Sequence, residues 1–356
     1  MNRNQQKLTL LVLVLAIVAG LVFAGPAAAK PKFTVAWSIY VGWMPWDYAD
    51  HSGILDKWSD KYGIEIEMVR MDYIPSVEAY VGKQVDAAVM TNMECLNMPA
   101  ASGIDSTVLI VGDYSNGNDA LLTRGGKNVK GLKGETVNLV ELSVSHYLLA
   151  RALQSLGKTE RDINVVNTSD ADMIAAWQTP DVTAAVTWNP LVAEIAAMPD
   201  AHKVFTSADI PGEIIDLTVV NTETLADNPA FGKALAGAWY ETMSIMASDT
   251  EAGREARAAM GAASGTDLAG YDMQLDSTKM FYDPADAAAF ARSEDLPATM
   301  DAVRTFLFDH GLLGVGAPSP DVVGIVYPDG TVQGDEGNVA FRFVTDYMDA
   351  AANGDL

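Results

Sequence analysis

Acidic and aromatic side chains follow several apolar segments of this chain, at the points where predicted strands end. The residues with this placement are Trp43, Trp46, Glu94, Asp113, Glu141, Ser143, His146 and Trp188. In an open α/β sheet the carboxyl ends of the strands meet at one edge, and ligands bind at that edge. Carboxylates accept hydrogen bonds from N–H groups, and indole faces attract cations. These residue types therefore predict a small-molecule site. Asp216, on a later apolar segment, is a further candidate residue for that site.

Each of these residues also has a structural interpretation that needs no ligand. Glu94, Asp113 and Ser143 are residue types that cap helices and turns. His146 lies inside a predicted helix, where an ordinary core histidine is an equal alternative. Tryptophans often pack in cores or between lobes. Their occurrence together after five strand ends favours the binding interpretation.

Strand-length apolar segments alternate with helical segments over much of the chain. The predicted strands are residues 33–39, 63–71, 85–90, 108–111, 137–140, 163–166 and 182–187. The predicted helices are residues 48–62, 143–156, 171–178, 231–248, 251–260 and 298–308, and residues 318–337 form a predicted turn-rich loop. This alternation predicts α/β architecture, with parallel sheets covered by helices on both faces. The Ala-rich helices after about residue 226 are expected to cap one lobe.

Composition excludes several classes of function. The chain has 356 residues, with 23 Lys and Arg against 47 Asp and Glu, so its formal net charge is −24. Such a charge repels nucleic acid and anionic lipid, and neither is an expected partner. The single cysteine, Cys95, excludes an internal disulfide and a cysteine-based zinc cluster. No metal site, phosphate loop or activated nucleophile stands out, so we expect no cofactor and no enzymatic activity.

The N-terminus has the pattern of a secretory leader. Arg3 and Lys7 precede an uncharged, mostly apolar run over residues 8–23, and small residues up to Ala29 follow. This order predicts a signal peptide over residues 1–29, cleaved near Ala29. An uncleaved anchor is the alternative, but the run is shorter than the roughly 20 residues that a bilayer span needs. We therefore expect a periplasmic protein.

Four short motifs are similar to those of the periplasmic binding proteins of nitrate, sulfonate and taurine ABC importers. In this chain they read GKQVDAA (residues 82–88), LKGETV (132–137), SVSHYLL (143–149) and DVTAAVTWNP (181–190). They occur in the order found in that family and extend over most of the chain after the leader. The whole chain also resembles a narrower branch, encoded beside urea carboxylase and associated with urea and guanidine.

The resemblance implies a type II periplasmic binding protein with two α/β lobes, a ligand cleft between them and two crossing strands. Residues 30–118 and 220–356 would form lobe 1, and residues 119–219 would form lobe 2. The crossings are expected near residues 118–122 and 216–220. The implied partners are a small-molecule ligand and an ABC transporter permease, and we expect a monomer.

Departures from the family pattern predict the charge of the ligand. Glu141 and Leu142 stand where the family has a Gly at a helix start, and Glu94 occupies another predicted helix start. An anion beside Glu94, Asp113 and Glu141 would meet like charges at low dielectric. A flat cation would gain from paired carboxylates and from the indole faces of Trp43, Trp46 and Trp188. The predicted ligand is therefore guanidinium, ahead of neutral urea.

Other functions remain open at this point. Taurine, another sulfonate or nitrate would be bound by the same fold. Some proteins resembling this fold are enzymes that make the thiamine pyrimidine or process menaquinone precursors, although the leader argues against a cytoplasmic enzyme. A sensory or adhesive extracellular module is a third alternative.

Overall fold

The computed structural model describes residues 29–356. The predicted leader, apart from Ala29, lies outside these described residues. Contacts divide the chain into a unit Met1–Pro31 and a compact unit Lys32–Leu356, and the description below concerns the second. None of the helices described is long and apolar enough to cross a lipid bilayer.

Residues 29–356 form two β-sheets, of which the larger has nine strands. Its order is β13 (Val332–Gln333), β12 (Gly324–Val326), β14 (Val339–Phe343), β4 (Ser106–Ser115), β10 (Ile215–Asn221), β3 (Ala87–Thr91), β1 (Lys32–Trp37) and β2 (Glu65–Arg70), and β11 (Thr278–Met280) pairs with β4. The apolar central strands β3 and β4 are buried on both faces, as in sheets covered by helices.

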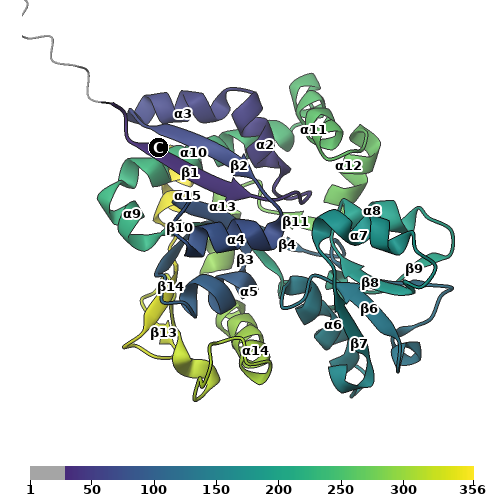
Figure 1. Cartoon of the computed structure of the whole chain (residues 1–356). Coiled ribbons are helices and arrows are strands. Elements are labelled where there is room, and N and C mark those ends of the chain that lie inside the picture. Colours follow the sequence, from purple (N-terminus) through teal and green to yellow (C-terminus); the bar gives the residue numbers. More distant parts are fainter. Residues whose placement is uncertain (1–28) are drawn as a thin grey trace, which may run out of the picture. The chain divides into compact units, whose positions relative to one another are not determined.

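The smaller sheet, within the same described part of the chain, has five strands and lies beside the larger one (Figure 1). Its order is β7 (Asn164–Asn167), β6 (Thr136–Leu139), β8 (Ala184–Thr187), β5 (Ala120–Arg124) and β9 (Ala201–Thr206). The chain leaves the larger sheet after β4 and returns to it at β10. The division into lobes at residues 118 and 219 stays a prediction.

The helices that follow the small-sheet strands are α6 (Val144–Gln154), α7 (Asp170–Trp177) and α8 (Leu191–Ala196). The remaining helices are α2 (Met44–His51), α3 (Ile54–Tyr62), α4 (Tyr73–Val81), α5 (Asn92–Cys95), α9 (Thr222–Asp227), α10 (Pro229–Met246), α11 (Glu251–Ala263), α12 (Leu268–Leu275), α13 (Pro284–Ala291), α14 (Asp295–Asp309) and α15 (Asp346–Asn353). Side-chain caps define several starts, because Ser143, Ser169 and Thr250 each accept a hydrogen bond from a first-turn amide.

Three expectations about local structure are corrected. The single helix predicted over residues 48–62 is two helices, α2 and α3, because Gly53 adopts a left-handed conformation (φ 79°) between them. The sheets are mixed, since β10 runs antiparallel to β3 and β4, and β5 runs antiparallel to β8 and β9. The predicted loop over residues 318–337 contains a short 3₁₀ helix, Pro320–Val322, and the antiparallel pair β12–β13.

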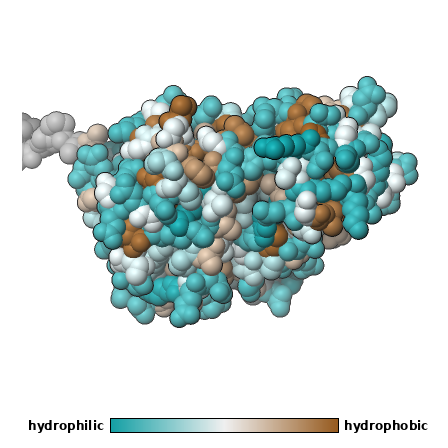
Figure 2. Space-filling model, turned by 90° about the horizontal axis from the view of Figure 1, so that it is seen from below, coloured by the Kyte–Doolittle hydropathy of each residue, from teal (hydrophilic) through white to brown (hydrophobic). Residues whose placement is uncertain are grey.

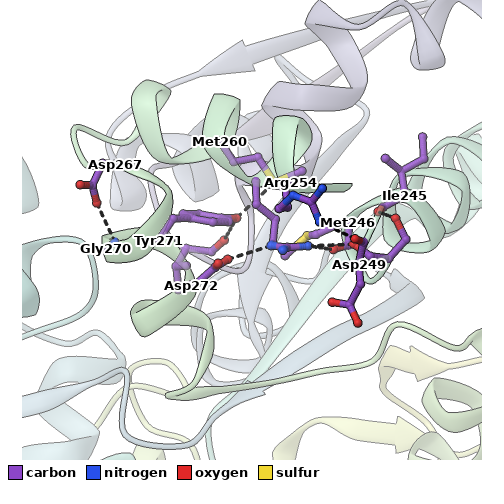
Figure 3. Close-up of polar contacts among 12 residues, drawn as sticks. Ile245, Met246, Asp249, Arg254, Met260, Asp267, Gly270, Tyr271 and Asp272 are labelled. Carbon is purple, nitrogen blue, oxygen red and sulfur yellow. Dashed lines mark hydrogen bonds and ion pairs between the residues drawn. The ribbon is translucent and has the colours of Figure 1, made fainter. Parts of the chain in front are cut away.

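Aromatic packing joins the C-terminal helices to the first strands. Phe33 of β1 stacks on Phe231 of α10 with ring centroids 4.4 Å apart. Figure 3 shows Tyr271 of α12 beside Met260 of α11, and the Tyr271 hydroxyl also donates to the carbonyl oxygen of Val41 at 2.9 Å. The C-terminal helices therefore fix the loop between β1 and α2.

On the face seen in Figure 2, hydrophilic residues predominate and hydrophobic ones form small separate groups.

Candidate functional site

A small cavity lies where strands of both sheets end. Its lining residues are Tyr40, Trp43, Tyr73, Thr91, Asp119, Val144, Trp188, Ile214 and Asp216. The centre of a water molecule has about 10 Å³ in which to move there, which is the space of about one water. Two larger hollows, of about 650 and 710 Å³, lie beside Trp58 and Arg151 and contain none of these residues. The small cavity is the candidate site because aromatic and acidic groups converge on it.

Four aromatic rings form a continuous wall of this cavity. Trp43 contacts Tyr40 and Tyr73 with ring centroids 5.1 and 5.4 Å apart, and Tyr73 contacts Trp188 at 5.6 Å. Trp188 comes from the smaller sheet, and its Nε1 donates to the Ile39 carbonyl oxygen at 3.1 Å. Trp43 and Trp188 are both 4% exposed. The structure thus places two of the three predicted tryptophans at one cavity.

Asp113 and Asp216 lie directly opposite each other in the register of β4 and β10. Both are buried, at 0% and 3% exposure, and Asp216 lines the cavity. The Tyr40 hydroxyl donates to Oδ1 of Asp113 at 3.1 Å, whereas Oδ2 of each aspartate receives no hydrogen bond from an N–H or hydroxyl group within residues 29–356. The two carboxyls are close enough to share a proton with each other. Unpaired buried carboxylate oxygens are energetically costly. This pair therefore offers acceptors that a ligand with N–H groups would satisfy.

Asp119 is the second carboxyl that lines the cavity and the third buried one in this region. It is 2% exposed, and its Oδ2 accepts a hydrogen bond from Ser115 Oγ at 2.5 Å. None of the ion pairs found within residues 29–356 includes Asp113, Asp119 or Asp216. Three acids thus share one buried region without a basic partner from this part of the chain.

Burial shifts the proton equilibria of these three acids. It raises the pKa of Asp113 to about 7 and the pKa of Asp119 to about 7. Burial, followed by repulsion from Asp113, raises the pKa of Asp216 well above its ordinary value. Desolvation and like charges both disfavour the ionised form of a carboxyl. A cation bound among these groups would reverse both effects.

The loop after β1 reaches Asp113 because it carries a glycine. A methyl group on Gly42 would overlap Oδ2 and Cγ of Asp113 and the Tyr40 ring. Val41 N also donates to the Asn189 carbonyl oxygen at 3.3 Å, which joins this loop to the segment after β8. Gly42 therefore allows the close approach that brings Tyr40 and Trp43 to the aspartates.

Glu94 lies behind the cavity wall. It is fully buried, and its Oε2 accepts hydrogen bonds from Thr91 Oγ1 and from the Tyr73 hydroxyl, the latter at 2.7 Å. Its Oε1 accepts a hydrogen bond from the backbone N–H of Val144 at 2.8 Å. Glu94, a predicted site residue, thus contacts two lining side chains, Tyr73 and Thr91, and the start of α6. It does not line the cavity itself.

Five other predicted site residues do not line the cavity, and of these Asp113 lies directly behind it, opposite Asp216. Trp46 is fully buried and packs against Trp239 of α10, with ring centroids 5.0 Å apart. Glu141 is exposed to solvent. Ser143 is the N-cap of α6, and its Oγ accepts a hydrogen bond from Ser145 N and donates to the Val140 carbonyl oxygen. His146 points toward a different group of side chains.

His146 belongs to a cluster with Glu160 and His310. Its Nδ1 accepts a hydrogen bond from Leu142 N at 3.1 Å, so its proton is on Nε2, which lies 2.5 Å from Glu160 Oε1. His310 directs Nδ1 to the Phe306 carbonyl oxygen and Nε2 to Glu160, which requires two protons on the ring. Burial alone would raise the pKa of Glu160, but the two histidines lower it to about 2. The three side chains form an ion-paired cluster away from the cavity, and their ligand atoms lie within 4.8 Å of one another, close enough to hold a metal ion.

Sequence reasoning missed six lining residues: Tyr40, Tyr73, Thr91, Asp119, Val144 and Ile214. Tyr73 was detectable, because it follows β2 just as Trp43 follows β1. Asp119 lies next to the predicted crossing near residue 118. No local signal distinguishes the other residues from ordinary core positions.

Comparison with known proteins places this geometry in a family. The model of the NMT1-like family matches residues 36–261. The chain is also similar to the taurine-binding periplasmic protein of Escherichia coli (strain K12), with 30% identity over 109 residues. That match covers 30% of this chain and 33% of the relative, so the chain spans about a third of the length of this curated relative.

Two solved structures have the same fold. The alkanesulfonate-binding protein of Xanthomonas axonopodis pv. citri bound to MOPS matches with a TM-score of 0.65 and 17% identity, over 81% of this chain and 96% of that one. The ligand-binding component of an ABC-type import system from Staphylococcus aureus, with zinc bound, matches with a TM-score of 0.63 and 12% identity, over 82% and 95%. The predicted periplasmic-binding-protein fold is confirmed.

Proposed function

The chain belongs to the NMT1-like family, and we propose that it is the solute-binding component of an ABC importer and captures guanidinium. The family and the fold support the first part of this proposal. The observation that carries the ligand is the pair of buried aspartates Asp119 and Asp216, which line the cavity opposite four aromatic rings, with buried Asp113 behind Asp216. None of the three has an ion-pair partner among residues 29–356. An acidic leader-bearing chain of this fold is expected to act in the periplasm and to deliver its ligand to a permease.

Charge favours a cation over the anions bound by related proteins. The described lining residues include two aspartates, Asp119 and Asp216, but no lysine, arginine or histidine. A sulfonate or nitrate placed there would meet like charges in a region shielded from water. A cation would instead satisfy the unpaired oxygens of Asp113 and Asp216. This supports guanidinium rather than taurine or nitrate.

Shape favours guanidinium over a compact ammonium ion. Guanidinium is flat, presents its N–H donors in one plane and binds carboxylates through two parallel hydrogen bonds. Its face can lie on an indole or phenol ring, as Trp43 and Trp188 provide here. The cavity is also small, so a ligand of guanidinium size needs less opening than an alkanesulfonate.

Urea is a second candidate, supported by the proton equilibria. Because burial raises the pKa of Asp113 to about 7 and that of Asp216 well above its ordinary value, a carboxylic acid O–H is present in mildly acidic conditions. Such a group can donate to the urea oxygen while a neighbouring carboxylate accepts from its N–H groups. Guanidinium should prevail where the acids are ionised.

We propose that binding proceeds by closure of two lobes, residues 30–118 with 220–356 and residues 119–219. Three contacts join the two lobes around the cavity: Glu94 with Val144, Val41 with Asn189, and Trp188 with Ile39. Such contacts are expected of a closed conformation, and hinge motion would break them.

Isothermal titration calorimetry of the protein without residues 1–29 tests the proposal. Near pH 8, guanidinium should bind most tightly, urea weakly, and taurine and nitrate not measurably, since Asp113 and Asp119 are then largely ionised. Tight binding of taurine or nitrate without binding of guanidinium would contradict it. Tighter binding of urea than of guanidinium at every pH would select the second candidate.

The tryptophans provide a matched pair for locating the ligand. We expect Trp43→Leu to weaken guanidinium binding by about 2- to 30-fold, the equivalent of a cation–π contact of roughly 0.5–2 kcal/mol. Trp46→Leu should leave affinity unchanged, because Trp46 packs against Trp239 outside the cavity, and should lower the unfolding free energy by about 2–3 kcal/mol. Calorimetry measures the guanidinium affinities of the two variants, and thermal melts measure their stabilities. Equal losses of affinity in the two variants would argue against this cavity.

A further inference from the structure

The N-terminus of α6 forms part of the cavity wall but has no free amide. α6 has 11 residues, and its first residue, Val144, lines the cavity. Val144 N donates to Glu94 Oε1 at 2.8 Å, and Ser145 N donates to Ser143 Oγ at 3.1 Å. The next two amides, of His146 and Tyr147, donate to the Ser143 carbonyl oxygen. First-turn amides are the groups with which a helix binds an anion.

Glu94 reaches this helix from the other sheet. It lies on α5, directly after β3 of the larger sheet, whereas α6 follows β6 of the smaller one. Three donors converge on its carboxylate: Val144 N, the Tyr73 hydroxyl and Thr91 Oγ1. Burial raises the pKa of Glu94 above its ordinary value, and these hydrogen bonds oppose that shift. Because all three of these partners donate, the geometry suits the ionised form of Glu94.

We propose that Glu94 determines the charge selectivity of the site by occupying, with its own carboxylate, the anion position at the start of α6. The inference rests on the proposed function, in which the cavity binds a cation. A ligand that carries an anionic group would find the Val144 amide already bonded and a negative charge beside it. The acids of the cavity, including the unpaired Oδ2 of Asp216, which is 3% exposed, still accept the cationic part.

This arrangement explains how a chain similar to a taurine-binding protein could bind a simple cation and reject a ligand that also carries an anionic group. Taurine carries an ammonium group and a sulfonate group. The aspartates would accept the ammonium group, but the sulfonate would need the amide that Glu94 occupies. Removing the Glu94 side chain should therefore expose an anion position next to the cation position and admit zwitterions.

The test compares Glu94→Ala with the unaltered protein by calorimetry, with taurine, guanidinoacetate and guanidinium as probes. In Glu94→Ala the ratio of the taurine to the guanidinium dissociation constant should fall at least about tenfold, because one repulsive charge is lost and one amide donor is gained. Guanidinoacetate should show the same change. Glu94→Ser, which keeps a polar group near Tyr73 and Thr91, should behave alike and is the second variant if the alanine variant does not fold.

Two controls separate occupancy of the amide from loss of charge. Glu94→Gln loses the charge but keeps an oxygen for Val144 N, so the selectivity ratio should change clearly less than in Glu94→Ala. Adding Val144→Pro to Glu94→Ala removes the amide while proline suits the first position of a helix, so the gain should fall to that of Glu94→Gln. A gain in Glu94→Gln equal to that in Glu94→Ala, or a gain that Val144→Pro leaves undiminished, would overturn the proposal.

A second readout does not depend on guanidinium. Formate should raise the melting temperature of Glu94→Ala, by replacing the lost carboxylate, and should not do so for the unaltered protein or for Glu94→Ala with Val144→Pro. No formate effect and no change of selectivity would overturn the role of Glu94. Absence of guanidinium binding to the unaltered protein, with the formate effect present, would instead overturn only the proposed ligand.

Discussion

Replacing Asp216 with asparagine should weaken guanidinium binding at least about 30-fold, because a hydrogen bond to a charged partner contributes roughly 1.5–3 kcal/mol and its electrostatic attraction is also lost. Asp216 lines the cavity, and its Oδ2 receives no hydrogen bond from an N–H or hydroxyl group within residues 29–356. An asparagine has nearly the same shape, so the aromatic wall should remain in place. Calorimetry near pH 8, above the pKa of about 7 of Asp113 and of Asp119, measures the loss.

The same substitution should stabilise the protein when no ligand is present. Asp216 lies opposite Asp113 and close to Asp119 in a region without a basic partner, and burial followed by repulsion from Asp113 raises its pKa. Removing one of these charges relieves the repulsion. A thermal melt near pH 8 should therefore show a higher melting temperature for Asp216→Asn, with an expected rise of about 2–4 °C for each kcal/mol gained.

Glu141→Gln is the matched control for Asp216→Asn. It removes the same charge from a residue that the sequence also suggested for the site, but Glu141 is exposed and does not line the cavity. Neither affinity nor melting temperature should change measurably. If Asp216→Asn lowered both affinity and stability, Asp216 would be a structural residue rather than a residue whose unfavourable buried charge serves ligand binding.

Guanidinium affinity should rise steeply with pH between about pH 6 and pH 8. Guanidinium keeps its charge throughout this range, so the change comes from the protein. Burial raises the pKa of Asp113 to about 7 and that of Asp119 to about 7, and it raises the pKa of Asp216 well above its ordinary value. Below about pH 7 binding must first release protons, and the logarithm of the association constant should rise by about one to two for each pH unit.

The stability of the unliganded protein should change in the opposite direction. An acid whose folded pKa lies above its unfolded pKa contributes stability at low pH, and that contribution is lost as the pH rises through the folded value. The unliganded melting temperature should thus fall from about pH 5 to pH 8, while the increase caused by guanidinium grows. The hydrogen bond to Glu160 raises the pKa of His310, so the contribution of His310 to the stability of the protein also falls as the pH rises. Affinity is therefore the more specific readout.

Calorimetry in buffers of different ionisation enthalpy provides the control for this pH dependence. Near pH 6.5 the apparent binding enthalpy should depend on the buffer, because protons leave the aspartates when guanidinium binds. In Asp216→Asn the number of released protons should fall. Affinity that stays constant from pH 6 to pH 8 would show that these acids are not at the binding site.

The sequence was informative about the fold because the relevant signals are local. Apolar segments predicted seven of the fourteen strands that residues 29–356 form, and the order of short motifs predicted the family. Trp43 and Trp188 follow strands, so the general rule about strand ends predicted them as well, whereas Asp113 lies inside β4 rather than after it. The break at Gly53 and the pair β12–β13 were missed, because a left-handed glycine and short strands leave weak periodicity.

What the sequence determined by itself is the type of protein: an acidic α/β chain with a leader-like N-terminus and with tryptophans and carboxylates after its strands. Only the tertiary structure decided which of them meet. Trp43 and Trp46 are three residues apart, yet one faces the cavity and the other packs on Trp239. Asp216 opposes Asp113 through the register of β10 and β4, and Glu94 caps a helix that begins 50 residues later. Burial, pKa and partners depend on contacts between distant segments, which no local pattern encodes.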